Sequence, residues 1–187
     1  MDDQSDGPFS RPPEMEDLFA VCKRLNECHA NYVLIGGFSV ILHGFERTTK
    51  DIDLLVDSSV HNIQKVKEAL SYLPDKAVLQ VEDNDVDQYQ VVRVADEFVI
   101  DLMAKACGVS YEEAKDSIEW MEIEGVKIPV ASKELLIRTK DTVRPSDKMD
   151  VEFLKYQISL SHQKTSPQNS FFRKILARLG CCLTKHQ

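Results

Sequence analysis

The segment Asp51–Val56 constrains the fold of this chain more than any other. In an extended strand, successive side chains point to opposite faces, so one face of this segment is hydrophobic and the other carries Asp51 and Asp53. We therefore expect a strand that is anchored in a core on one side and holds two neighbouring carboxylates on the other. Like charges this close repel, and each raises the pKa of the other. A divalent cation removes that penalty, and hard oxygen ligands suit magnesium or manganese.

A third carboxylate, Asp101, lies within the run 98–103, which is hydrophobic on both faces. Such a run predicts a central, buried strand. An unpaired carboxylate there costs several kcal/mol or shifts its pKa. A role as third metal ligand, or as a base for a hydroxyl nucleophile, would explain the residue. A salt bridge to an arginine such as Arg93 is the alternative explanation.

Two glycines, Gly36 and Gly37, stand between a predicted strand at 32–35 and a predicted helix at 38–43. Glycine lets the backbone approach a ligand closely, and the N-terminus of a helix aims N–H groups at phosphate. A glycine pair alone is weak evidence, because many tight turns contain one. The pair becomes informative because an Asp-x-Asp strand follows it, and the intervening residues leave room for one helix and a return loop.

The pattern from Gly36 to Asp53, with Asp101 downstream, resembles the signature of the nucleotidyltransferase superfamily, whose fold is of the polymerase-beta type. More narrowly, it is similar to bacterial proteins related to abortive-infection-type nucleotidyltransferase toxins. A second segment, from Glu134 to Asp150, resembles the Lys…Arg…Asp helical motif that follows the core in such proteins. Together the two matches cover roughly residues 30–155.

This resemblance implies an α/β (α+β) fold in which helices flank a mixed β-sheet, with magnesium or manganese at Asp51, Asp53 and Asp101. It also implies a nucleoside triphosphate site nearby. The expected contributors to that site are a backbone turn, a hydroxyl pair and three basic side chains: Gly36, Gly37, Ser39, Thr49, Arg47, Lys140 and Arg144.

The activity that the resemblance implies is transfer of a nucleoside monophosphate to an acceptor hydroxyl by a two-metal mechanism. The acceptor stays open among an RNA or transfer-RNA end, a protein and a small molecule such as an antibiotic. The alternative is a non-catalytic nucleotidyltransferase-like module that binds nucleotide or a protein partner.

The composition of the chain limits which partners and which cellular compartment are expected. The formal net charge of −8 over 187 residues disfavours a broad basic platform for nucleic acid. Five cysteines, an odd number, argue against a disulfide framework and favour a reducing cytoplasm. No hydrophobic run is long enough to predict a membrane-spanning segment.

Four segments are expected along the chain: a disordered arm at 1–13, a nucleotidyltransferase core at 14–130, a helical subdomain at 131–160, and a basic linker with an amphipathic tail at 161–187. The last segment has five basic residues and no acid. An amphipathic helix there would bind a protein partner or an anionic membrane surface, or else dock on its own domain.

Periodicity and turn residues predict the elements of these segments. Beyond those already given, helices are expected at about 13–29, 58–73, 110–118, from 132 onward and 146–160, and strands at 77–81, 89–94, 120–123 and 126–130. A turn is expected at 83–85.

Overall fold

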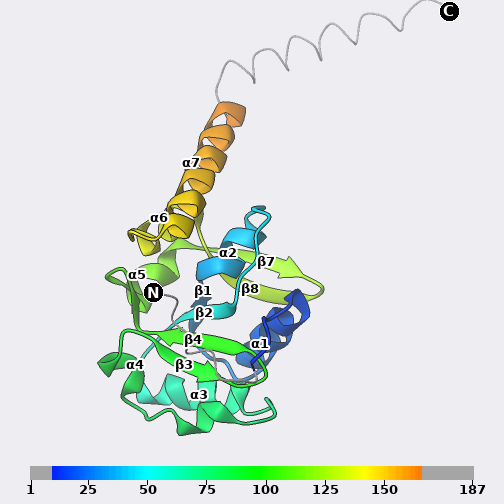
Figure 1. The fold of residues 1–187 in the computed structure, drawn as a ribbon, viewed down its shortest axis with the longest axis vertical. Coiled ribbons are helices and arrows are strands. Elements are labelled where there is room, and N and C mark those ends of the chain that lie inside the picture. The colour runs from blue at the N-terminus through cyan, green and yellow to red at the C-terminus, as the bar shows by residue number, and fades with distance from the viewer. Residues whose placement is uncertain (1–9, 166–187) are drawn as a thin grey trace, which may run out of the picture.

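A mixed six-stranded sheet forms the centre of the molecule in a computed structural model, which describes residues 10–165 (Figure 1). The strand order is β3-β4-β2-β1-β8-β7. β2 runs parallel to β4 and β1 runs parallel to β8, whereas the other neighbours are antiparallel. The strands are β1 (Tyr32–Leu34), β2 (Asp51–Val56), β3 (Val92–Ala95), β4 (Val99–Met103), β7 (Ile118–Ile123) and β8 (Val126–Ala131). The predicted fold class, a mixed sheet flanked by helices, is confirmed.

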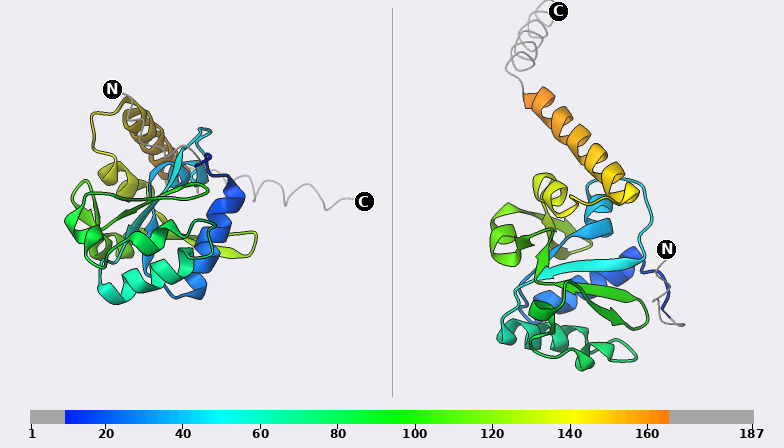
Figure 2. Two further views of the ribbon diagram at one scale, coloured as in Figure 1. Left: turned by 60° about the horizontal axis from the view of Figure 1, so that its bottom comes forward. Right: turned by 60° about the vertical axis from the view of Figure 1, so that its left-hand side comes forward.

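Helices cover both faces of this sheet (Figure 2). They are α1 (Met15–Glu27), α2 (Gly36–Leu42), α3 (Val60–Leu70), α4 (Asp85–Gln88), α5 (Tyr111–Ala114), α6 (Lys133–Thr139) and α7 (Pro145–Thr165), with short 3-10 turns at η1 (Ala77–Gln80) and η2 (Lys115–Ser117). A small hairpin joins β5 (Lys105–Ala106) to β6 (Val109–Ser110). Serines begin three of these helices by accepting a backbone N–H: Ser59, Ser110 and Ser132.

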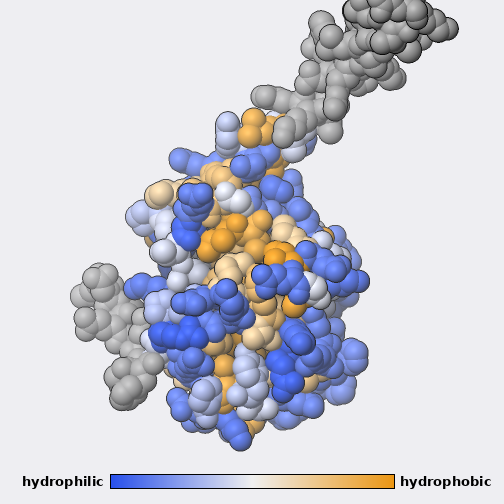
Figure 3. Space-filling view, turned by 90° about the vertical axis from the view of Figure 1, so that its right-hand side faces the viewer, coloured by the Kyte–Doolittle hydropathy of each residue, from blue (hydrophilic) through white to orange (hydrophobic). Residues whose placement is uncertain are grey.

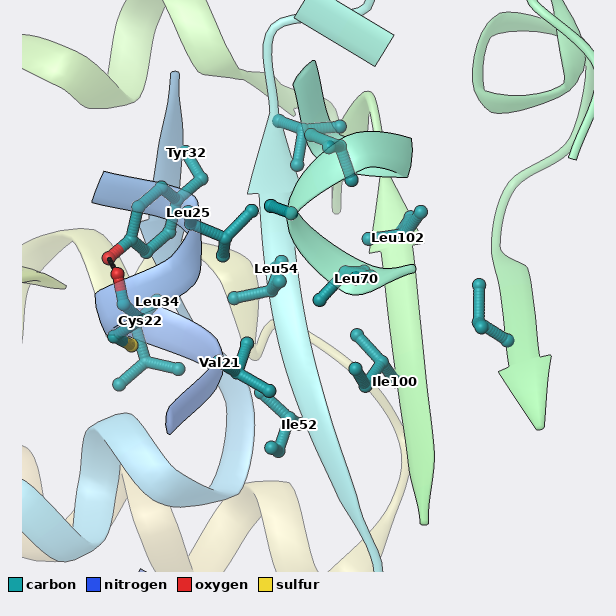
Figure 4. Packing of buried hydrophobic residues seen from close by; sticks show 14 of the residues in the cluster. Val21, Cys22, Leu25, Tyr32, Leu34, Ile52, Leu54, Leu70, Ile100 and Leu102 are labelled. Carbon is teal, nitrogen blue, oxygen red and sulfur yellow. Dashed lines mark hydrogen bonds between the residues drawn. The ribbon is translucent and has the colours of Figure 1, made fainter. Parts of the chain in front are cut away.

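One face of the sheet packs on α1 and α3 and contains the larger hydrophobic cluster (Figure 4). Its strand residues are the hydrophobic face of β2 and the matching positions of β4: Ile52, Leu54, Val56, Ile100 and Leu102. The Tyr32 hydroxyl at the edge of this cluster has two acceptors, the carbonyl oxygen of Cys22 at 3.4 Å (Figure 4) and Oδ1 of Asn26 at 3.1 Å. Partly buried hydrophobic residues surround this cluster, and Figure 3 shows hydrophobic residues gathered between hydrophilic ones on one side of the molecule.

The opposite face packs on α2, α5, α6 and α7 and contains a second cluster. Leu55 of β2 and Met103 of β4 point into it, together with Leu136 of α6 and Leu154 of α7. Since side chains alternate along β2, Asp51 and Asp53 lie on this same face. The C-terminal helices therefore stand on the face that carries the carboxylates.

Several local predictions are wrong. The segment 77–81 is not a strand: Ala77–Gln80 is a 3-10 turn in which only Val78 is buried, and Lys76 before it has a positive φ of 50°. The turn expected at 83–85 is present at residues 83–84, and α4 begins directly after it. The strand expected at 89–94 begins only at Val92, because pairing with β4 covers residues 92–95 and does not reach Tyr89. In this region, individual hydrophobic side chains are buried against α3 and the sheet, but their backbone does not hydrogen-bond to a neighbouring strand.

The predicted ends also need correction. Within the expected disordered arm, residues 10–13 are ordered, because Arg11 forms a parallel bridge with Phe98 and ion pairs with Asp17 and Glu97. Helix α7 extends to Thr165, so the first residues of the predicted linker are helical. Residues 1–9 and 166–187, with the rest of the predicted arm and tail, lie outside the described residues. No helix between residues 10 and 165 combines the length and hydrophobicity needed to cross a membrane.

Candidate active site

Three carboxylates meet where β2 and β4 run side by side. The parallel register places Asp53 directly opposite Asp101, and Asp51 lies two residues before Asp53 on the same face. One oxygen from each of the three carboxylates lies within 4.8 Å of the other two. This spacing and ligand type can hold a hard divalent cation. The arrangement follows from the strand register, which the sequence pattern alone does not contain.

The electrostatics of the cluster disfavour its full ionisation. Burial, with repulsion from Asp51 and Asp101, raises the pKa of Asp53 to about 7, against the opposing influence of Lys140 and the Gly37 N–H. Burial and repulsion from Asp101 also raise the pKa of Asp51, although a hydrogen bond from Thr49 and the charge of Arg93 oppose the shift. A bound cation would relieve this strain between neighbouring negative charges.

Arg93 of β3 pairs with the third carboxylate. It lies directly opposite Asp101 in the antiparallel register, and its Nε and Nη2 donate hydrogen bonds of 3.0 Å each to the two carboxylate oxygens. Nη2 also lies 3.8 Å from an oxygen of Asp51. The salt bridge considered as an alternative for Asp101 is thus present together with the metal-binding geometry. The two are compatible, because each carboxylate oxygen has two lone pairs.

The glycine pair is packed directly against this cluster. Gly36 has a φ of +65°, and a Cβ on it would lie 1.8 Å from Oδ2 of Asp53. A Cβ on Gly37 would lie 2.3 Å from Oγ1 of Thr49. The Gly37 N–H donates to Oδ2 of Asp53 at 3.4 Å, and the Thr49 hydroxyl donates to Oδ1 of Asp51 at 3.2 Å. The glycines are therefore required by close approach to the carboxylate strand.

Two of the predicted basic residues meet at a residue to which the sequence pattern assigned no role. Asp150 of α7, only 1% exposed, accepts a hydrogen bond from Nη1 of Arg47 and lies 2.8 Å from Nζ of Lys140. Lys140 also donates to Asp147 at 3.2 Å. Asp150 closes the second motif noted in the sequence, and its function as a shared partner could be read only from the fold.

The remaining candidates, Ser39 and Arg144, lie in different environments. Ser39 is fully buried, and within residues 10–165 its hydroxyl has no hydrogen-bond partner, so it is not presented at the open surface of the site. Arg144 is exposed just before α7, and its backbone N–H donates to Thr142. The structure thus brings together Gly36, Gly37, Arg47, Thr49 and Lys140 around the carboxylates, but not the side chains of Ser39 and Arg144.

One solved structure of low sequence identity agrees with this architecture. The lincosamide antibiotic adenylyltransferase LnuA, solved with lincomycin bound, is 20% identical with a TM-score of 0.50, covering 78% of this chain and 98% of its own. A protein from Thermotoga maritima described as a nucleotidyltransferase is 19% identical with a TM-score of 0.48, covering 88% of this chain and 92% of its own. A search of curated proteins finds no match.

A family model described as aminoglycoside-2''-adenylyltransferase matches residues 17–154. The match runs from α1 into α7 and includes the three carboxylates, the glycine pair and Asp150. The resemblance to the nucleotidyltransferase superfamily is thereby confirmed, while the narrower similarity to abortive-infection-type toxins stays a prediction. The chain belongs to the aminoglycoside-2''-adenylyltransferase family.

Proposed function

We propose that this protein transfers a nucleoside monophosphate from a nucleoside triphosphate, with ATP the expected donor, to a hydroxyl of an acceptor. The observation that carries the proposal is the convergence of Asp51, Asp53 and Asp101 within 4.8 Å on one face of the sheet. The raised pKa values of Asp51 and Asp53 fit a site for a divalent cation better than an exposed acidic patch. Membership of an adenylyltransferase family supports the same reaction class.

The reaction forms one bond and breaks another. The acceptor oxygen attacks the α-phosphorus, the bond from that phosphorus to the oxygen bridging toward the β-phosphorus breaks, and pyrophosphate leaves. The acceptor hydroxyl loses its proton in this process, and Asp101 is the candidate base or metal ligand, held in orientation by Arg93. A magnesium or manganese ion held by the three carboxylates would supply charge neutralisation for the triphosphate and activation of the hydroxyl.

The residues around the carboxylates have matching roles in this proposal. The absence of a Cβ at Gly36 and Gly37 leaves room for the carboxylate of Asp53 and the hydroxyl of Thr49. Arg47 and Lys140 supply positive charge for the triphosphate, and their shared partner Asp150 holds both in place. Thr49 orients Asp51 through its hydroxyl. Positioning and charge neutralisation would account for most of the catalysis.

A small hydroxyl-bearing molecule is the acceptor class that the comparisons favour. The family description refers to the 2''-hydroxyl of an aminoglycoside, and LnuA is described as acting on lincosamides. The RNA-end and protein acceptors considered from the sequence have no comparable support.

Label transfer from α-labelled nucleoside triphosphates tests the proposal. The acceptor panel contains aminoglycosides, a lincosamide, small phosphorylated sugars, transfer RNA and protein extract, each with magnesium or manganese. The Asp51→Asn/Asp53→Asn double variant removes the site, and Asp57→Asn, just beyond the same strand, is the matched control. Label on one acceptor, lost only in the double variant, is expected. Nucleotide binding without label on any acceptor would instead favour the non-catalytic module.

A further inference from the structure

The loop between α2 and β2, residues 43–50, carries two of the candidate residues to the site, Arg47 and Thr49. Residues 45–49 of this α2–β2 loop have no regular secondary structure. Within residues 10–165, no backbone hydrogen bond joins residues 46–50 to another element. The position of Arg47 therefore depends on what the side chains of the loop contact.

Helix α7 holds the α2–β2 loop through two neighbouring side chains (Figure 2, right). The rings of Phe45 and Phe153 are stacked, with their centroids 4.6 Å apart and their planes inclined by 18°. Three residues before Phe153, the carboxylate of Asp150 accepts a hydrogen bond from Nη1 of Arg47. Residues three apart are neighbours on a helix surface. One side of α7 thus contacts two positions of the loop that lie two residues apart.

These two contacts fix different parts of Arg47. The Asp150 carboxylate fixes the guanidinium group, whereas the ring stack fixes the backbone from which the arginine side chain extends. In this arrangement Nη2 of Arg47 lies 3.6 Å from the position that a Cβ of Gly37 would occupy. An arginine loses conformational freedom when it is ordered, and a group that is already ordered avoids this loss when a ligand binds. The ring stack therefore prepares Arg47 for a ligand at the glycine turn.

The ring stack is part of the second hydrophobic cluster. Phe45 and Phe153 are partly buried and pack against this cluster, which includes the fully buried Leu154. A well-oriented aromatic pair adds a free energy that corresponds to about 2- to 10-fold in an equilibrium constant, beyond the burial of its area. A change from phenylalanine to leucine keeps most of the hydrophobic contact and removes the ring geometry. The effect of the stack on Arg47 can therefore be separated from a general loss of packing.

We propose, resting on the nucleotidyl transfer argued above, that Phe45 and Phe153 are positioning residues for the nucleoside triphosphate. They hold the α2–β2 loop against α7, so that Arg47 reaches the glycine turn and meets the phosphate chain there. Both rings act through Arg47 and do not themselves contact the nucleotide. Recognition of the phosphate chain thus depends on the docking of α7, whose Asp150 is 103 residues from Arg47 in the sequence.

Affinity for ATP, measured with magnesium and without any acceptor, tests this role. Calorimetric titrations compare the unaltered chain with Phe153→Leu and Phe45→Leu at a temperature where all are folded. We expect the Kd for ATP to rise about 3- to 10-fold in each variant, because the guanidinium of Arg47 is less often in place. In an Arg47→Gln background, Phe153→Leu should cause no further loss, since the ring acts through the arginine.

Three control variants separate positioning from packing. Phe153→Tyr keeps the ring and should retain the ATP affinity of the unaltered chain. Phe19→Leu changes a partly buried phenylalanine that packs against the other hydrophobic cluster, and it should leave the Kd unchanged. The double variant Phe45→Leu/Phe153→Leu should lose no more affinity than either single variant, because the two rings form one contact.

Trypsin cleavage in the α2–β2 loop gives a readout that needs no nucleotide. Lys50 in this loop and Lys76 in a distant one are both exposed. Cleavage after Lys50 should be at least threefold faster in Phe153→Leu than in the unaltered chain, because the loop leaves α7 more often. Cleavage after Lys76 should be unchanged. Equal cleavage after Lys50 in the two proteins would show that the ring stack does not hold the loop.

The titrations distinguish failure of the positioning role from failure of the proposed function. An unaltered chain that binds no ATP would refute both. ATP binding that Phe153→Leu and Phe45→Leu leave unchanged would overturn the positioning role alone. A loss of the same size with Arg47 present and with Arg47→Gln would also overturn it, because the substitution would then distort the site without acting through the arginine.

Discussion

Arg93 and Asp101 face each other across the β3–β4 pair, and the guanidinium donates two hydrogen bonds of 3.0 Å to the carboxylate. This fork is the strongest geometry available to such a pair. It places one positive charge beside three carboxylates that would otherwise repel one another. Arg93 therefore acts as an internal counter-ion that lets the cluster form before any ligand binds.

Removing this counter-ion should make stability depend on metal. Arg93→Gln leaves the buried Asp101 without its partner, and we expect a loss of about 1–3 kcal/mol, since the arginine is one-third exposed. Millimolar magnesium should recover part of this loss by mass action. Thermal denaturation with and without magnesium measures both effects. Arg24→Gln, which breaks an exposed pair with Glu27, should cost less than about 1 kcal/mol and show no response to magnesium.

The close approach of Gly36 to Asp53 gives a second prediction. Gly36→Ala places a methyl group 1.8 Å from a carboxylate oxygen in the native geometry, so Asp53 must move. A displacement of about 1 Å at a reacting centre can cost about 100-fold in rate, and we expect a decrease of that order in kcat/KM.

A matched control separates this clash from backbone strain. Gly44 also has a positive φ, +97°, but a Cβ there meets no atom within 4 Å. Gly44→Ala should lower the free energy of unfolding by about 1 kcal/mol from left-handed strain alone, with kcat/KM nearly unchanged. Equal loss of activity in the two variants would contradict the proposed role of Gly36.

The shared carboxylate of Asp150 gives a third prediction. Asp150→Asn removes the charge that both Arg47 and Lys140 contact, and breaking a buried ion pair from one side costs about 3–5 kcal/mol. Affinity for ATP should fall as well, because both cations lose their orientation. In Asp147→Asn, Lys140 keeps Asp150, so we expect a smaller loss of stability. Chemical denaturation and calorimetric titration with ATP test the two variants, and a similar effect of both would refute the shared role.

The raised pKa of Asp53 predicts how stability varies with pH in the absence of metal. Its folded pKa of about 7 lies above the value near 4 of an unfolded aspartate, so the folded state binds more protons between these values. The free energy of unfolding should therefore decrease as pH rises from about 4 to 7. Magnesium binds the ionised form, so its stabilising effect should be larger at pH 8 than at pH 5.

Denaturation curves with EDTA or magnesium at several pH values check this sign. Asp53→Asn removes the titrating group and should flatten the pH dependence in EDTA. A metal-free protein whose stability instead rises from pH 4 to 7 in step with Asp53 would show that the carboxylate is stabilised as an anion without a cation.

The sequence by itself determined the strands that carry the chemistry. The alternation of 51–56 assigns Asp51 and Asp53 to one face because strand geometry is local, and the structure places both there. The hydrophobic run around Asp101 likewise predicts a buried central strand, and β4 is one. The α/β fold class and the superfamily follow from such local patterns and short motifs.

Predictions from the local sequence pattern were wrong where side chains are buried by tertiary contacts. The hydrophobic residues of 77–81 read as a strand, but Val78 and Val81 pack as single side chains beside a 3-10 turn. The helical position of Ser39 gave no sign that its hydroxyl would be enclosed. The burial of these side chains depends on which other elements pack over each segment.

Only the tertiary structure decided which distant residues meet. Asp150 joins Arg47, 103 residues away, to Lys140, and the register of β3 on β4 sets Arg93 against Asp101. Strand order and helix docking determine these pairs. Both are set by the free energy of the whole packed core and not by that of any one segment. Periodicity reports which face a residue occupies, whereas its partner on that face is a property of the packed molecule.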